Sequence, residues 1–301
     1  MKILFPLFLF PVLFAVNVLA QTRDFKTLSL DLSHRIVSSG AESVGVAVLD
    51  LNSGGRIAID ENKTFHAAST MKVPVMMRLF KLAAEKKLKL TDKVKIENSF
   101  KSIVDGSLYQ LDAGADGDPD LYKMVGSQMT VRDLIEHMIT RSSNLATNLL
   151  IDKADAREVT ALMRSLGARD IQIRRGVEDN KAFQAGLNNT TTAGDLMIAL
   201  KAIVEGKFIG RKFSDEMITI LARQHFNEGI PAGLPSGVKV AHKTGSITKI
   251  YHDAGIVFPP GRKPYVIVVL TRGFAKEEDA HKLVGEVSRM VYEVIGTKAP
   301  K

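Results

Sequence analysis

The segment "FHAASTMKVPVMMRLF", residues 65–80, places Ser69 three positions before Lys72 at the start of a long apolar run. Apolar residues fall on nearly every face of the helix that this run predicts, so we expect the helix to be buried. Side chains three apart on a helical turn face the same way, so Ser69 and Lys72 can meet. Two interpretations follow. Ser69 is a helix cap, because serine is a preferred N-cap, or it is a nucleophile whose proton a desolvated, neutral lysine accepts.

Two further motifs favour the nucleophile. Spacing alone does not decide, because Ser-x-x-Lys occurs three times, at Ser69–Lys72, Ser236–Lys239 and Ser246–Lys249. The chain also contains one Ser-x-Asn, Ser142-Ser143-Asn144, between two helical stretches. It contains one Lys-Thr-Gly, Lys243-Thr244-Gly245, at the end of a predicted strand. Each motif is weak singly, but the three in this order form a specific combination.

With these motifs the chain resembles the class A serine β-lactamases, within the penicillin-recognising serine hydrolases. The resemblance covers essentially the whole chain after its first 20 residues. Residues 45–73 resemble the family's first hairpin and nucleophile helix, and residues 129–150 resemble the segment around its second motif. Residues 188–196 resemble the close of its Ω-loop, and residues 230–246 resemble the approach to its third motif.

The resemblance implies a role for each motif residue. Ser69 would attack the lactam carbonyl, Lys72 would take its proton, and Ser142 would relay a proton to the leaving nitrogen. The backbone N–H groups of Ser69 and Ser246 would form the oxyanion hole, where one donor is worth roughly 3–4 kcal/mol of barrier. Asn144 would hold the side-chain amide of the substrate, and Lys243 with Thr244 would bind its carboxylate. The implied substrate-binding set is Asn144, Asn180, Thr244, Gly245 and Ser246.

The chain departs from the family at two places. Ser143 stands where class A enzymes usually have Asp, and since that residue is mainly structural we expect a modest effect. In the Ω-loop, the family holds its deacylating water with a Glu and, four residues later, an Asn. Counting back from Thr190 puts Asn180 on that Asn and Gly176 on the Glu, whereas counting forward from Ser142 puts Glu178 there.

Glu178 is therefore the best candidate for the deacylating base, with Asp179 behind it. In the alternative, both carboxylates pair with Arg174 or Arg175 and only brace the loop. A base must reach its water as well as titrate suitably. Without a working base, acylation would proceed and release would be slow.

The periodicity predicts an α+β fold. Residues 24–38 and 276–295 read as helices, residues 43–51 and 56–60 as a hairpin, and residues 238–242, 253–258 and 265–271 as strands. Short turns imply an antiparallel sheet of about five strands, flanked by the N- and C-terminal helices and interrupted by a large all-helical lobe. We expect residues 21–68 and 224–301 to form the α/β lobe and residues 69–223 the helical lobe, with the site in the cleft between them.

The first 20 residues read as a secretory signal peptide, with Lys2, an apolar stretch and small residues before a cleavage near Ala20. Two prolines interrupt the stretch, which is shorter than the roughly 20 residues of a bilayer span. We therefore expect a protein that is exported, to the periplasm or beyond, with no membrane anchor after cleavage. The chain has no cysteine, so it is stabilised by burial without disulfides.

Composition argues against several other classes of function. The net charge is +8, but no aromatic residues accompany the lysines as a nucleic-acid surface would need. The seven histidines show no paired metal-ligand spacing, so we expect no metal and no cofactor. The expected partner is a small molecule, a β-lactam or a D-Ala-D-Ala-like substrate, and the expected state is a monomer. Three functions remain open: β-lactamase, D,D-peptidase or esterase, and a slow-releasing penicillin-binding protein.

Overall fold

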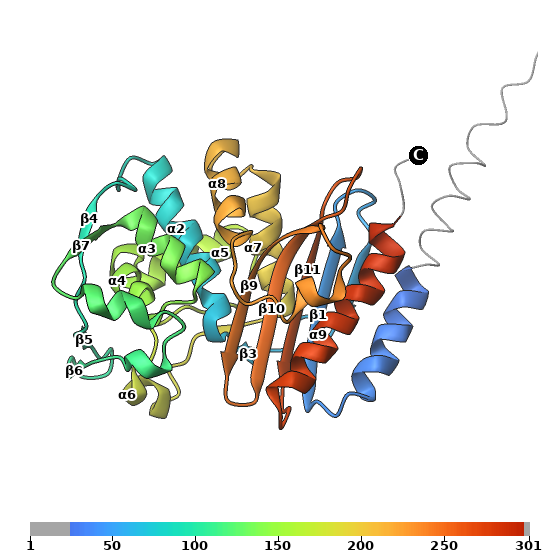
Figure 1. Ribbon diagram of the computed structural model, residues 1–301, viewed down its shortest axis with the longest axis horizontal. Coiled ribbons are helices and arrows are strands. Elements are labelled where there is room, and N and C mark those ends of the chain that lie inside the picture. Colours follow the sequence, from blue (N-terminus) through green and yellow to red (C-terminus); the bar gives the residue numbers. More distant parts are fainter. Residues whose placement is uncertain (1–24, 298–301) are drawn as a thin grey trace, which may run out of the picture.

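The computed structural model describes residues 25–297, so the expected cleavage site near Ala20 lies outside the described residues. At its centre is a five-stranded antiparallel sheet in the order β2-β1-β11-β10-β9 (Figure 1). The strands are β1 (Ser43–Asp50), β2 (Arg56–Ile59), β9 (Lys239–Ile247), β10 (Ile250–Phe258) and β11 (Tyr265–Arg272). The two ends of the chain thus build one sheet, which confirms the predicted fold class.

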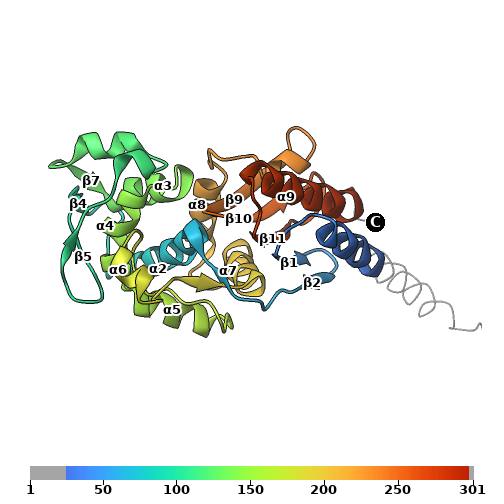
Figure 2. The same ribbon diagram turned by 90° about the horizontal axis from the view of Figure 1, so that it is seen from below.

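Helices cover both faces of the sheet. A helix over residues 25–37 lies beside α9 (Glu277–Val291) and its π-helical continuation η5 (Tyr292–Gly296) on one face (Figures 1 and 2). On the other face, α7 (Ala193–Glu205) packs against β1, β10 and β11. Because side chains alternate between faces, Ile267 and Val269 of β11 join the core under the terminal helices, and Val266 and Val268 join the core toward α7. A strand covered on both sides is therefore apolar at nearly every position.

The insert is built around α2 (Lys72–Ala84), which packs against α3, α4, α5, α7 and α8. Pro74 is tolerated in this buried helix because it lies in the first turn, where its missing N–H costs little. The other helices are α3 (Val131–Thr140), α4 (Asn144–Ala154), α5 (Ala156–Ser165), α6 (Asn180–Gln184) and α8 (Arg211–Leu221). Short 3₁₀ helices are η1 (Ala68–Met71), η2 (Ala113–Ala115), η3 (Pro119–Met124) and η4 (Ile230–Gly233).

Side-chain caps begin the helices α3 and α7. Thr130 accepts a hydrogen bond from Asp133 N (3.0 Å) at the start of α3, and Thr192 accepts one from Asp195 N (3.1 Å) at the start of α7. Gly206 ends α7 with φ +69°, a left-handed conformation that glycine adopts without strain. These ends are set by local chemistry, which is why the sequence predicts them.

The insert differs from the all-helical expectation in one respect, because it also contains short strand pairs. These are β4 (Lys93–Lys95) with β7 (Gln128–Thr130), and β5 (Phe100–Lys101) with β6 (Leu108–Tyr109). In addition, β8 (Thr190–Thr191) of the insert pairs with β3 (Phe65–His66), which lies just before the insert. The acidic segment 105–120, which reads as an exposed loop, buries Asp116 and Asp118. Turn-forming residues predict that a loop is present, not what it packs against. Within residues 25–297, no helix is long and apolar enough to cross a bilayer.

Candidate active site

Ser69 lies in the 3₁₀ turn η1, directly before α2. The N-cap of α2 is Met71, without a side-chain hydrogen bond, so Ser69 does not serve as the cap of that helix. The turn is held by Thr70, whose hydroxyl donates to Ala67 O, and by Ala67 N, which donates to Asn189 O (2.9 Å). Ser69 is the second residue of η1, and an N–H so close to a helix start has no partner within the helix. This N–H is free to act as a donor to a ligand.

The edge strand β9 brings a second such donor to Ser69. A Cβ at Gly245 would lie 3.0 Å from Ser69 N, so only glycine permits the strand to approach this closely. Ile247 and Ile250 flank a two-residue turn, and Ser246 lies opposite Tyr251. Hydrogen-bonded and non-hydrogen-bonded pairs alternate along an antiparallel ladder, so the register points the Ser246 N–H away from β10. Ser69 and Ser246 also line one cavity, so their N–H groups are the candidates for an oxyanion hole.

Lys72 is fully buried and directed at the second motif. Its Nζ donates to Ser142 O (2.7 Å), Ser142 Oγ (3.2 Å) and Asn144 Oδ1 (2.9 Å). Burial lowers the pKa of Lys72 to about 7, and the negative charges of Asp116 and Glu178 act in the opposite direction. An amine with this pKa is neutral about half of the time at neutral pH, so it can accept a proton.

Ser142 lies between two lysines. It connects α3 and α4 and has φ +57°, a strained conformation for a residue with a side chain. Its Oγ accepts hydrogen bonds from Lys72 Nζ and, at 3.0 Å, from Lys243 Nζ, which also donates to Thr244 O (2.9 Å). Burial, and then the charge of Lys72, hold the pKa of Lys243 well below its usual range. The three groups form a continuous path for a proton.

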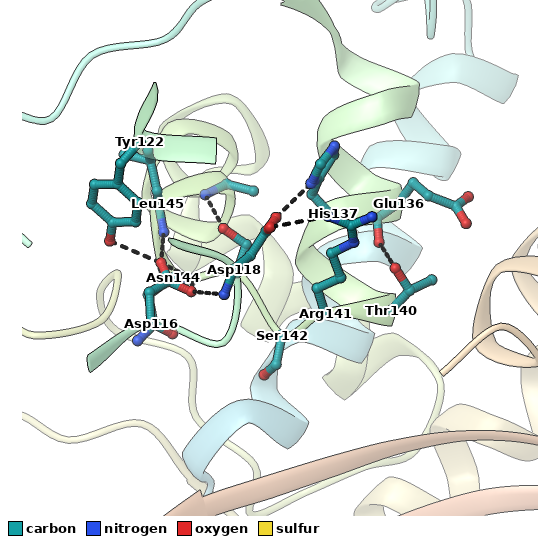
Figure 3. A network of polar contacts seen from close by, with 12 residues as sticks. Asp116, Asp118, Tyr122, Glu136, His137, Thr140, Arg141, Ser142, Asn144 and Leu145 are labelled. Atoms are coloured by element: carbon teal, nitrogen blue, oxygen red, sulfur yellow. Dashed lines mark hydrogen bonds and ion pairs between the residues drawn. The ribbon is translucent and has the colours of Figure 1, made fainter. Parts of the chain in front are cut away.

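The start of α4 is fixed by a carboxylate that the sequence analysis did not single out. Asp116 accepts hydrogen bonds from Asn144 N (2.9 Å), Leu145 N (3.0 Å) and the Tyr122 hydroxyl (2.8 Å), as Figure 3 shows. A negative charge at a helix N-terminus is stabilised by the helix dipole. Ser143 provides the side-chain cap by accepting from Ala146 N (3.2 Å). Asp116 and Ser143 together therefore hold the first backbone N–H groups of α4.

Glu178 faces the same cluster from the opposite side. Asn144 Nδ2 donates to Glu178 Oε1 (2.7 Å), while Asn144 Oδ1 accepts from Lys72, so one amide joins the two ionisable groups. The guanidinium of Arg175 donates instead to Leu187 O, Gly176 O and Asn188 Oδ1, and Arg174 donates to Gln172. The structure thus places Glu178 toward Lys72, and its arginine neighbours are engaged elsewhere.

Gly176, the other position indicated by the sequence counts, leaves no room for an acid. A Cβ there would lie 2.3 Å from Asn148 Oδ1. Asn148 accepts from Val177 N (2.7 Å) and donates to Val177 O (3.0 Å), so it clamps the loop just before Glu178. A side chain at position 176 would break this clamp. Of the two counted positions, only 178 carries a carboxylate, which accepts a hydrogen bond from Asn144.

Asp179 has a structural role. It caps α6 by accepting from Ala182 N (3.1 Å), and it accepts from Ser102 Oγ (2.9 Å) and Ile103 N (2.9 Å). Burial raises its pKa, but these three hydrogen bonds outweigh burial and leave the pKa below its ordinary value. Both of its carboxylate oxygens are engaged in these contacts. Asp179 thus holds the end of the loop that presents Glu178.

Two cavities open on Ser69, one on each side. The first, of about 390 Å³, is lined by Ser69, Asn144, Glu178 and Asn180, with the exposed Phe183 and Ile247 at its rim. The second, of about 370 Å³, runs along β9, and its lining includes Ser69, Ser142, Asn144, Thr244, Gly245 and Ser246. The structure therefore brings every residue of the predicted site to one region, although Ser69 and Ser246 are 177 positions apart in the chain.

Comparisons with known proteins agree with this geometry. The β-lactamase enzyme family model matches residues 30–295. The β-lactamase AST-1 of Nocardia asteroides is 31% identical over 86% of this chain and 81% of its own, and ROB-1 of Haemophilus influenzae is 27% identical over 84% and 79%. Two solved structures are similar: an ancestral class A β-lactamase (TM-score 0.77, 28% identity, 88% and 99% coverage) and PBP-A (0.74, 27%, 89% and 95%). This chain belongs to the β-lactamase enzyme family, as a class A serine β-lactamase-like member.

Proposed function

We propose that this protein hydrolyses β-lactams through a serine acyl-enzyme. The observation that carries the proposal is the Ser142 hydroxyl, held between Lys72 and Lys243 at 3.2 and 3.0 Å, in a cavity that it shares with Ser69. A helical lobe of residues 69–223 and an α/β lobe of residues 21–68 and 224–301 would enclose the site between them. We further propose that the protein is exported after cleavage near Ala20 and acts as a monomer.

The acylation step uses Lys72 as base. Neutral Lys72 accepts the proton of Ser69 Oγ, and Oγ bonds to the lactam carbonyl carbon. The negative charge on the carbonyl oxygen is stabilised by the N–H groups of Ser69 and Ser246. The C–N bond of the lactam then breaks, and its nitrogen takes a proton from the Ser142 hydroxyl, which is replenished from the lysines. Lys243 keeps Ser142 oriented for this transfer.

The deacylation step uses Glu178. A water between Glu178 and the acyl carbon loses its proton to the carboxylate, and the resulting oxygen bonds to that carbon. The bond from the carbon to Ser69 Oγ then breaks, and Oγ takes up that proton. Asn144 donates to Glu178 Oε1 and so sets the direction of the carboxylate. Asn180 lines the same cavity from the first residue of α6 and is placed to position the water.

Steady-state turnover of a chromogenic cephalosporin by residues 21–301 tests the proposal. We expect multiple turnovers, complete loss on Ser69→Ala, and no requirement for added metal. A stoichiometric burst without turnover, with an adduct that persists for hours in intact-mass spectrometry, would instead identify a slow-releasing penicillin-binding protein. Release of D-alanine from an acyl-D-Ala-D-Ala peptide with poor lactam turnover would identify a D,D-peptidase.

A further inference from the structure

The end of the second cavity that lies beside Ser246, on β9, is acidic. Glu277 is the first residue of α9, and its Oε1 accepts a hydrogen bond from the Ser246 hydroxyl (2.7 Å). The ionisable side chains that line this cavity within the described residues are Glu228, Tyr251, Glu277 and His281, of which the two glutamates are acidic. Such an end differs from the basic pocket that the family resemblance implies for a substrate carboxylate.

One buried polar atom at this end, the Tyr251 hydroxyl, has no hydrogen-bond partner within residues 25–297. Tyr251 lines the cavity, and only 4% of its surface is exposed. The ring of His281 lies 4.0 Å from the Tyr251 ring, and its Nε2 lies 3.5 Å from Glu277 Oε1, so His281 faces Glu277. Buried polar groups normally have a hydrogen-bond partner, so the Tyr251 hydroxyl indicates that a ligand group or water completes it.

The neighbouring lysine does not offset the acidity. Lys243 is fully buried, and its Nζ is directed at Ser142 Oγ and Thr244 O rather than along the strand toward Glu277. Its pKa lies well below the usual range because of burial, which favours the neutral amine. Thr244 and Ser246 are two residues apart and so present their side chains on the same face of β9. A substrate group bound at Thr244 would therefore lie next to the Ser246–Glu277 pair.

We propose that Glu277, together with Glu228, makes this end of the cavity a charge filter that disfavours substrates with a carboxylate beside Thr244 and favours those with a neutral or cationic group there. Glu277 acts in two ways. It occupies the Ser246 hydroxyl, which would otherwise donate to an anion, and it repels an anion directly. This inference rests on the proposed function, since it concerns the substrates of the same serine.

The size of the effect follows from exposure. The Glu277 side chain is 54% exposed, so solvent screens much of its repulsion. We expect Glu277→Gln to raise kcat/KM for a carboxylate-bearing cephalosporin by roughly three- to tenfold, mainly through a lower KM, with the gain shrinking at high salt. The methyl ester of the same cephalosporin, which carries no charge at that position, should change by less than about twofold.

Glu278→Gln is the matched control. Glu278 is the next residue in the first turn of α9, and its side chain is exposed. The substitution removes the same charge as Glu277→Gln, but Glu278 lines neither this cavity nor the neighbouring one. An equal change for acid and ester, no change for either, or the same gain in Glu278→Gln would each overturn the proposal. If neither compound acylates Ser69 by mass spectrometry, the proposed lactam hydrolysis is wrong. Calorimetric binding of acid and ester to Ser69→Ala, with and without Glu277→Gln, then measures the filter independently.

Discussion

Replacing Glu178 with Gln should change two measurable steps in different ways. Glu178 is linked to Lys72 through Asn144, and its negative charge helps to keep the Lys72 pKa from falling further under burial. Removing the charge therefore lowers the Lys72 pKa and makes the neutral amine available at lower pH. The same substitution removes the base for the deacylating water. Acylation should persist, and release should fail.

The magnitude for the unsubstituted protein follows from the Lys72 pKa of about 7. A group with this pKa is neutral for about 10% of molecules at pH 6, about 50% at pH 7 and about 90% at pH 8. Because neutral Lys72 is the acylating form, the acylation rate should rise about fivefold from pH 6 to 7 and less than twofold from 7 to 8. In Glu178→Gln the midpoint should move to lower pH, and deacylation should slow by about 10²–10⁴-fold.

Stopped-flow measurement of the acylation burst, about every half pH unit between pH 5.5 and 8.5, gives the midpoint of acylation. Intact-mass detection of the adduct over time gives the rate of deacylation. Glu278→Gln is a suitable control, because it changes the net charge equally at a distance from Lys72. The reasoning would be refuted by acylation independent of pH across this range, or by a midpoint that rises in Glu178→Gln. Unchanged steady-state turnover would transfer the role of base away from Glu178.

Three further predictions follow from the contacts around the site. Asp179→Ala removes the α6 cap and the acceptor for Ser102 Oγ and Ile103 N, so thermal unfolding should show a loss of about 1–2 kcal/mol of stability. It should also slow deacylation more than acylation, and equal slowing of both would contradict the role of Asp179 in holding the loop. Gly176→Ala places a Cβ 2.3 Å from Asn148 Oδ1 and should cost about 1–3 kcal/mol, so an unchanged Tm would disprove the clamp. Gly245→Ala places a Cβ 3.0 Å from Ser69 N and should slow acylation about tenfold or more. The same stopped-flow traces also give the deacylation rate for comparison.

Much of the fold is predictable because its signals are local. The strands β1 and β11 are apolar runs bounded by turns, and the caps Thr130 and Thr192 lie beside the helices that they start. The same holds for the chemistry of Ser69, whose neighbours in the chain supply both the helical turn and the lysine. Local periodicity and short motifs act through a few adjacent residues, so they can be read without coordinates.

The Ω-loop is a different case. The two sequence counts disagree between Gly176 and Glu178. The side chain that fills the space beside Gly176 is Asn148, which lies almost thirty positions earlier. Glu178 itself has φ +59°, which no spacing rule anticipates. A loop register depends on which distant side chain occupies which space, and that information is not contained in the loop.

The amino-acid order thus specifies the sheet, the buried helix and the nucleophile, since each depends on short-range pattern. Three features depend on residues brought together across the fold: Asp116 at the start of α4, Glu178 opposite Lys72, and Glu277 on Ser246. Hydrogen bonds and pKa shifts act over a few ångströms in space, regardless of the distance along the chain. The pattern that suggests Ser69 as the nucleophile is therefore visible in the sequence, whereas the contacts proposed to govern product release and substrate choice are visible only once the chain is folded.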